Sequence, residues 1–187
     1  MTLFDFTLRP VIEDDLQLLF EWRNRLEVRA YMYTYSEIPL SDHCKWFASM
    51  LVDPARQFLV LSMKGVECAV VAYTNIEEGE SSSWGFYTGP NAPAGVSLIV
   101  ELAGLSYAFE TLGLRRLHCE VLSGNQQVIN LHTKAGFTRE GCLRQARQTM
   151  RGLEDVIIFG MLDDEWPPAQ TRLYARAERF FELSRKK

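Results

Sequence analysis

The chain has 187 residues, which suits one domain with a substantial core, or one domain with a short appendage. Its composition of 47% hydrophobic and 24% charged residues is typical of a soluble globular protein. The net charge of -4 argues against a nucleic-acid-binding protein, because such proteins usually carry a basic patch. No run approaches the roughly 20 apolar residues of a membrane span, and residues 1–10 do not form a signal peptide. We therefore expect a cytoplasmic protein without a membrane segment.

The cysteines are spread along the chain, at Cys44, Cys68, Cys119 and Cys142. None stands at metal-ligand spacing, and a chain of this length does not depend on a disulfide scaffold. We expect reduced, mostly buried thiols and no metal site.

The first half of the chain predicts strands and helices in turn. Phe6–Val11 predicts a strand, and a helix follows near Glu13, where acidic residues suit a helix N-terminus. Ser41 is the expected N-cap of a second helix. Apolar runs then predict three strands, at 58–63, 68–76 and 83–88.

The second half begins with a break at 89–95, which holds two glycines and two prolines. A helix with an apolar face follows from Val96, and a strand at 116–123 alternates between two faces. A short helix at 125–135 ends at Gly136, a suitable left-handed helix end. The last strands form a hairpin, at 141–150 and 155–162. This order predicts an α/β fold with a mixed, mostly antiparallel sheet flanked by helices.

The composition shifts after Trp166, which predicts one domain at 1–166 and an amphipathic helical tail at 167–187. The apolar stripe of the tail consists of Leu173, Tyr174, Ala177, Phe180 and Phe181. Either this stripe packs on the body of the domain, or it forms the contact of a homodimer.

A strand, a glycine-rich break and a helix in succession can bind phosphate. A helix N-terminus offers unpaired amides and a partial positive charge, and a glycine lets the backbone approach a ligand closely. We expect a pyrophosphate to face the amides of Ala94, Gly95, Val96 and Ser97. An ordinary strand-to-helix turn explains the same pattern.

A more specific pattern follows at 120–137. Glu120 lies on a strand, Asn125 comes five residues later, and a short helix then ends at Gly136-Phe137. This pattern resembles the last core motif of the GNAT N-acetyltransferases, and the resemblance covers roughly Phe6 to Trp166. It implies the GNAT acyl-CoA N-acyltransferase fold, acetyl-CoA as co-substrate and direct transfer of acetyl to an amine.

The loop at 89–95 falls where this family binds the CoA pyrophosphate, although two positions depart from the family pattern. Ala92 stands where Gln or Arg is usual, and Ser97 stands where Gly or Ala is usual. The departure affects one side-chain contact and leaves the backbone amides in place. The resemblance also implies that Asn125 and Asn130 flank the helix along the pantetheine arm.

The resemblance implies Glu120 as the base that accepts the amine proton, directly or through water. The alternative is a solvated strand residue or a structural ion pair. His118 shares its strand face and could replace or tune it. His132 stands where many family members place a tyrosine acid, but a histidine of pKa about 6.5 is only about a quarter protonated at pH 7. His132 therefore donates a proton, contacts the CoA sulfur or merely packs.

Within the family, Glu21–Asn24, Val28–Met32 and His43–Phe47 resemble the nucleotide-sugar N-acetyltransferases of pseudaminic acid biosynthesis. That resemblance implies the 4-amino group of UDP-4-amino-4,6-dideoxy-N-acetyl-β-L-altrosamine as acceptor, and a role in flagellin glycosylation. The expected substrate-binding residues are Arg29 and His43 for phosphates, Tyr31 and Trp46 for uracil or sugar, and Tyr73 and Tyr87 as further lining.

Two other functions stay open. Protein N-terminal acetyltransferases share Trp-Arg-Asn-like patterns, but they need a groove for an extended peptide. A non-catalytic CoA-binding sensor would have no base, so Glu120 argues against it. Structural roles are also open for Trp46 in the core and for Arg29 in a surface ion pair.

Overall fold

A seven-stranded sheet forms the centre of the structure, a computed structural model that describes residues 5–185. Its strands lie in the order β1-β2-β3-β4-β5-β7-β6. Their bounds are β1 (Phe6–Pro10), β2 (Arg56–Met63), β3 (Val66–Glu77), β4 (Ser81–Thr88), β5 (Arg116–Leu122), β6 (Thr138–Thr149) and β7 (Gly152–Leu162). Within the described chain, the β4–β5 pair is parallel and the other neighbouring pairs are antiparallel. The predicted α/β class, with a mixed, mostly antiparallel sheet, is confirmed.

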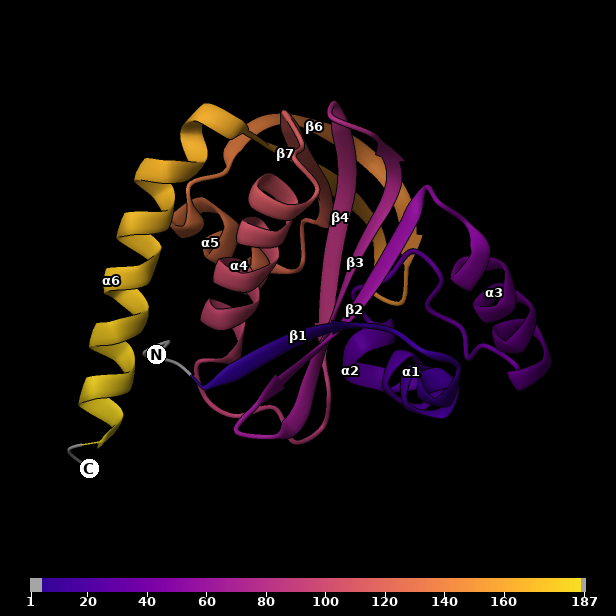
Figure 1. Ribbon diagram of the computed structural model, residues 1–187. Helices are drawn as coiled ribbons and strands as arrows, with labels where there is room; N and C mark the ends of the chain where they lie inside the picture. The colour runs from indigo at the N-terminus through magenta and orange to yellow at the C-terminus, as the bar shows by residue number, and fades with distance from the viewer. Residues whose placement is uncertain (1–4, 186–187) are drawn as a thin grey trace.

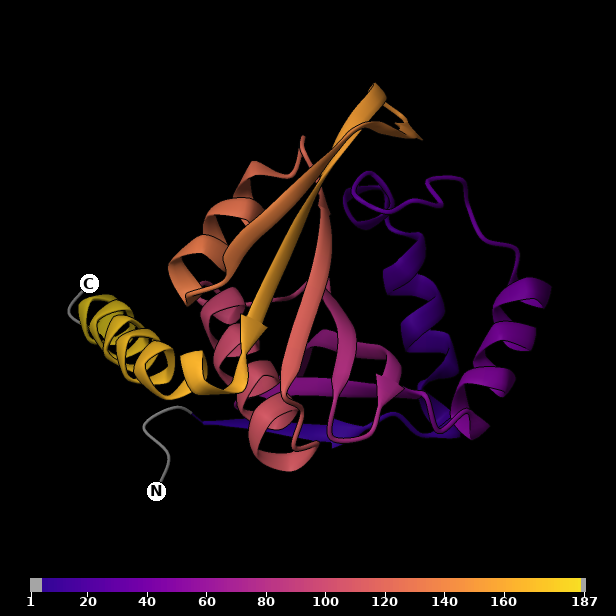
Figure 2. The same ribbon diagram turned by 90° about the horizontal axis from the view of Figure 1, so that it is seen from above.

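Helices cover both faces of this sheet (Figures 1 and 2). One face carries α1 (Leu16–Asn24), α2 (Leu26–Arg29) and α3 (Leu40–Val52). The other face carries α4 (Val96–Ser106), α5 (Gln126–Ala135) and α6 (Trp166–Arg185). Single turns of other helix types lie at Glu13–Asp15, Tyr107–Thr111 and Asp163–Glu165. In the part of the chain that the structure describes, no helix is both long and apolar enough to cross a membrane.

The central strands are apolar on both faces because helices cover both. On β2, Leu59 and Leu61 pack into the core on the α4 side, and Val60 between them packs into a smaller core with α1 and α3. Strands buried on both faces become continuous hydrophobic runs rather than alternating ones. This explains why the apolar run at 58–63 was a clear strand signal.

The sheet opens in its middle, between β4 and β5. These strands pair at three positions, from Ser81↔Arg116 to Ser83↔His118. Beyond them, β5 continues along β7, and in residues 5–185 no further pair joins β5 to β4. The edge of β4 from Trp84 to Thr88 therefore has backbone donors and acceptors without partners across the opening, and such groups need partners elsewhere.

Of the predicted helix ends, Gly136 is confirmed, Asn125 precedes its helix as the N-cap instead of being its first residue, and Ser41 is not a cap. Asn125 caps α5, with its Oδ1 accepting from the Val128 N–H at 3.3 Å. Gly136 ends that helix in the left-handed region, with φ 109°. The prediction for Ser41 is wrong, because α3 begins at Leu40 and the extended Pro39 is its N-cap. The carbonyl of Pro39 accepts from the amides of Asp42 and His43 and so starts the helix two residues earlier than a cap at Ser41 would.

The C-terminal helix α6 packs on the body of the domain. Its stripe places Leu173 and Ala177 in the main core, together with Trp166 and Ala169. The two prolines after Trp166 do not interrupt it, because they lie in the first turn, where a missing N–H costs no helical hydrogen bond. This packing favours the body contact over the homodimer contact for the buried part of the stripe.

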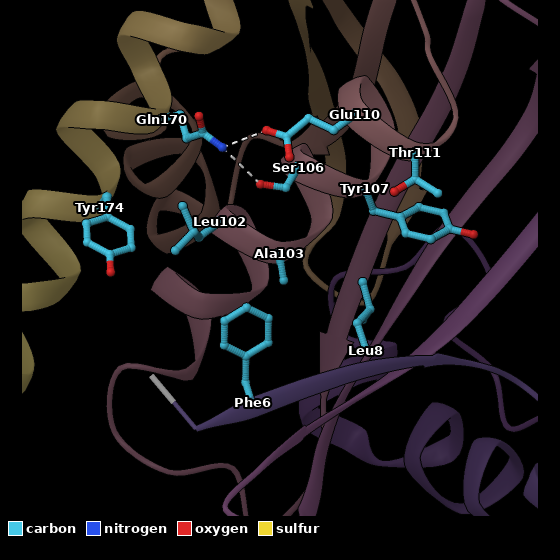
Figure 3. A pocket seen from close by; sticks show the side chains of 10 residues that line it. All are labelled: Phe6, Leu8, Leu102, Ala103, Ser106, Tyr107, Glu110, Thr111, Gln170 and Tyr174. Carbon is cyan, nitrogen blue, oxygen red and sulfur yellow. Dashed lines mark hydrogen bonds between the residues drawn. The ribbon is translucent and has the colours of Figure 1, made fainter. Parts of the chain in front are cut away.

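Polar contacts also hold α6 against the turn after α4. Figure 3 shows Gln170 donating to the Glu110 carboxylate at 2.6 Å and to the Ser106 hydroxyl at 3.3 Å. Trp166 Nε1 donates to the same carboxylate at 3.0 Å. These residues border a hollow of about 320 Å³ with an apolar floor that includes Phe6 and Leu102.

Leu173→Ala tests whether α6 belongs to the domain core. We expect the free energy of unfolding to fall by about 2–5 kcal/mol, because the change leaves a cavity at a fully buried position. Urea denaturation followed by circular dichroism measures it. The control is Leu183→Ala on the same helix, where the side chain is 56% exposed and the expected change is within about 0.5 kcal/mol. Equal stability of the two variants would place α6 outside the core.

Candidate active site

A cleft of about 370 Å³ lies at the opening between β4 and β5. Its walls come from both strands, from α5, from the start of α4 and from the segment around α2. Six of the predicted site residues line it: Tyr31, Tyr87, Ser97, Glu120, Asn125 and His132. The cleft therefore brings together residues that are up to 101 positions apart (31 to 132) in the sequence.

Glu120 lies on β5, just beyond the last residue that pairs with β4. Its exposed carboxylate accepts a hydrogen bond from the Tyr33 hydroxyl. Burial and Glu120 together raise the pKa of Tyr33 to about 12, so the phenol remains the donor at neutral pH. The guanidinium of Arg147 lies 4.2 Å above the Tyr33 ring, a cation–π contact that fixes the ring.

Tyr33 is a site residue that sequence reasoning missed. It lies in the loop between α2 and α3, outside any motif, and its contact with Glu120 spans 87 positions. The β6–β7 hairpin reaches the same loop, where the Arg151 guanidinium lies 4.7 Å above the ring of Tyr31. The hairpin and the loop thus form the outer wall around the candidate base.

His132 forms a buried ion pair with Glu101. The His132 Nδ1 lies 2.7 Å from Glu101 Oε1, and the two side chains are 3% and 0% exposed. Burial by itself lowers the pKa of His132, but the Glu101 carboxylate and Cys119 outweigh it and raise the pKa to about 10. The imidazole is therefore protonated at neutral pH, rather than a quarter protonated as the unperturbed value suggests.

Sequence reasoning missed Glu101, although a signal was present. Glu101 is the one charged residue in the apolar helix α4 (Val96–Ser106). A charge in a helix that is apolar all round requires a partner when the helix is buried. Trp84 and Phe137, stacked with centroids 5.8 Å apart, enclose the pair on the side of β4.

The predicted phosphate loop joins β4 to α4. Gly95 caps α4 in the left-handed region, with φ 87°. The Val96 amide donates to the Pro93 carbonyl at 3.1 Å, whereas the amides of Ala94, Gly95 and Ser97 have no hydrogen bond within residues 5–185. Three of the four predicted amides are thus free to meet a ligand, and their roles stay predictions.

Gly95 also has a packing role. A Cβ at this position would lie 2.5 Å from the ring of Phe180 on α6. Glycine is needed there for the left-handed backbone and for the close approach of α6 to the loop.

The two predicted asparagines lie in different places. Asn125 lines the cleft with its Oδ1 engaged in the α5 cap, which leaves its Nδ2 for a ligand. Asn130 is exposed on α5 and does not line the cleft; it faces an adjoining groove next to α6. Their predicted roles at the pantetheine arm stay predictions.

A larger pocket of about 690 Å³ lies on the α1–α3 side of β4. It shares Met32 and the β4 residues 84–87 with the cleft, so the two spaces meet across this strand. His43, Trp46 and Tyr87 line it, as the sequence predicts for a substrate pocket.

His43 is an uncharged group in this pocket. Burial lowers its pKa, so the ring is neutral at pH 7 and meets a phosphate only as a hydrogen-bonding group. Its Nε2 is buried without a partner among the described residues.

Two predicted substrate residues are corrected by the structure. Tyr73 lies in the core, where its hydroxyl donates to the Gly104 carbonyl at 2.6 Å, so it lines no substrate pocket. Arg29 donates to the carbonyls of Asn24 at 2.9 Å and Tyr35 at 3.3 Å, and so holds the α2–α3 loop instead of facing the pocket.

Arg23 is the arginine that lines the pocket. Its Nη2 donates to the Thr34 carbonyl at 3.2 Å, and its Nη1 is buried without a partner among residues 5–185. Arg23 belongs to the Trp-Arg-Asn segment that the sequence analysis singled out. Helical periodicity alone does not show whether Arg23 or Arg29 points into the pocket.

Comparison with known proteins identifies the family. Residues 5–138 match the family model described as "Acetyltransferase (GNAT) domain". The chain belongs to the GNAT acetyltransferases. This confirms the predicted family, the acetyltransferase activity and acetyl-CoA as co-substrate.

Two relatives of this GNAT enzyme are named "Acetyltransferase PseH", both from Campylobacter jejuni. The protein of strain 81-176 is 26% identical over 124 residues, which cover 66% of this chain and 77% of the relative. The protein of strain NCTC 11168 is 24% identical over the same length. A solved spermidine N-acetyltransferase from Vibrio cholerae, in complex with CoA and spermine, superposes with a TM-score of 0.79 at 19% identity over 87% of this chain and 98% of that one. The structural likeness shows a shared fold.

The residues of the opening fit acetyl-CoA. The free edge of β4 offers backbone groups to the amides of a pantetheine arm, as an added strand would. The amides at the start of α4 offer donors and a partial positive charge to phosphates.

The pH dependence of stability tests the His132–Glu101 pair. The pKa of His132 is about 10 in the fold and about 6.5 in an unfolded chain, so protonation favours the fold. This stabilisation is full below about pH 6.5 and is lost as the pH rises through about 10. Urea denaturation at intervals from pH 6.5 to 10 should show wild type losing its advantage over His132→Gln.

The control is His118→Gln. Burial and Arg116 lower the pKa of His118, so its titration lies below this window. The difference between wild type and this variant should stay constant from pH 6.5 to 10. A constant difference for His132→Gln as well would contradict the raised pKa.

His118 lies outside the residues that line the cleft, which gives no support for a role beside Glu120.

Proposed function

We propose that this enzyme acetylates the 4-amino group of a UDP-4-amino-4,6-dideoxy sugar, in pseudaminic acid biosynthesis for flagellin glycosylation. The observation that carries the proposal is the pocket next to the cleft, which combines aromatic walls with an arginine whose buried Nη1 has no acceptor among the described residues. The similarity to the proteins named Acetyltransferase PseH supports it. So does the resemblance of the N-terminal segments to nucleotide-sugar N-acetyltransferases. Four free cysteines suit the reducing cytoplasm.

Arg23 is the residue for the substrate diphosphate. A guanidinium fork matches phosphate oxygens, and its buried Nη1 gains an acceptor when an anion binds. Trp46 and Tyr87 offer aromatic faces to the uracil or the sugar. His43 Nε2 adds a neutral hydrogen-bonding group.

Glu120 acts as the base for the amine. Its carboxylate is exposed at the edge of the cleft, where it exchanges the Tyr33 hydroxyl for the substrate amine and accepts a proton as the amine attacks. Acetyl-CoA supplies the acetyl group as a reactive thioester. Tyr33 keeps the carboxylate oriented before the amine arrives.

His132 contributes charge rather than a proton. Its pKa of about 10 exceeds the roughly 8.5 of a free thiol, so the proton stays on the imidazole when a thiolate leaves. A fixed cation at the wall of the cleft stabilises negative charge that develops there. Glu101 holds the imidazolium in place.

One observation favours a cationic amine instead. Glu37 and Asp42 line the same pocket as Arg23, and carboxylates suit a polyamine. A peptide N-terminus is the other acceptor to exclude.

The test is release of the CoA thiol from acetyl-CoA with three acceptors in parallel: the UDP-4-amino-4,6-dideoxy sugar, spermidine and a panel of N-terminal peptides. We expect rapid release with the sugar. Release with spermidine or peptides alone would overturn the proposed sugar substrate, while the acetyltransferase activity would stand.

Glu120→Gln tests the base. With the preferred acceptor, kcat should fall by about 10²- to 10⁴-fold, the usual contribution of a general base. The Kd for acetyl-CoA, measured by calorimetry, should stay unchanged. Glu78→Gln, in the exposed turn after β3, is the control and should keep the wild-type kcat. A Glu120→Gln enzyme with wild-type kcat would remove Glu120 from the mechanism.

A further inference from the structure

A groove of about 550 Å³ runs between the start of α4, α5 and α6. Three cations line it: Lys134 from α5, and Arg176 and Arg179 from α6. No carboxylate is among the described residues that line it. The groove is therefore electropositive although the protein carries a net charge of -4.

The three cations have no partner of their own. In the part of the chain from 5 to 185, none of them forms a hydrogen bond or an ion pair, and Arg176 Nη1 is buried without an acceptor. Other arginines of the protein are paired, such as Arg9 with Asp15 and Arg116 with Glu140. A buried donor without an acceptor is costly, so the groove is suited to an anion.

The groove continues from the cleft. Ser97, Gln127 and Val128 line both spaces, and Gly95 lies in the groove at the end of the phosphate loop. A ligand that lies along β4 and passes the amides of the loop therefore reaches the arginines of α6. Acetyl-CoA has this shape and chemistry, with a thioester at one end and a phosphorylated nucleotide at the other.

We propose that α6 completes the acetyl-CoA site, and that Arg176 and Arg179, with Lys134, bind the 3′-phosphate of its nucleotide. The proposal rests on the acetyl-CoA dependence of the enzyme and not on its acceptor. The match to the family model ends at residue 138, so Arg176 and Arg179 lie in a segment outside it, whereas Lys134 lies inside it. Phe180 of α6 packs next to Gly95, so α6 lies close to the predicted phosphate loop.

The consequence is selectivity for CoA over dephospho-CoA, which lacks the 3′-phosphate. Charge-assisted hydrogen bonds from two arginines should give wild type about a 10- to 100-fold preference. In the Arg176→Gln/Arg179→Gln variant, we expect CoA to bind about as weakly as dephospho-CoA. The Kd of dephospho-CoA should change little, and the affinity for CoA should lose most of its dependence on salt.

Isothermal titration calorimetry with the two ligands measures these constants without any acceptor amine, so the result does not depend on the identity of the sugar. Arg172→Gln is the matched control, because Arg172 is exposed on α6 and does not line the groove. Circular dichroism and the urea midpoint check that each variant folds. Arg179→Glu provides a second variant at an exposed position, and it should weaken the binding of CoA more than the binding of dephospho-CoA.

A double variant that keeps the preference for CoA would overturn the assignment. Equal weakening of both ligands would overturn it as well, because it would place the arginines at a group that CoA and dephospho-CoA share.

Discussion

The separation of β4 and β5 is the constraint on which the site depends. Their ladder ends at Ser83↔His118, so the middle of the sheet contains an edge with free backbone groups. A ligand that enters the sheet can pair with these groups, because an extended chain of amides offers matching donors and acceptors. The start of α4, Glu120 on β5 and part of the neighbouring pocket all border this opening.

The opening also brings charges into an apolar region. Glu101 and His132 form a pair among Trp84, Phe86 and Phe137, where screening by water is weak. Each charge depends on the other, because a single buried charge would be strongly destabilising. The positive charge at the wall of the cleft is thus built into the packing of α4 against α5.

Much of the fold could be predicted from the sequence, because periodicity and helix ends are local signals. The strands of the sheet, the helix that precedes Gly136 and the left-handed Gly136 itself all follow from such signals. The site could be predicted best where a motif fixed a residue, as for the position of Glu120 at the cleft. Tyr33, Arg23 and Glu101 were missed because contacts across many positions decide their direction. Tyr73 was misplaced for the same reason, since a strand residue near a site can equally face the core.

The contact between Phe180 and Gly95 has a consequence for biosynthesis. The helix α6 comprises the last 20 residues of the described chain, so the ribosome synthesises it after the strands of the sheet and after the loop that holds Gly95. Until α6 docks, Leu173 and Ala177 are missing from the main core, and the apolar side chains that they cover are exposed to water. A nascent or truncated chain without α6 would therefore expose this apolar surface to chaperones and proteases.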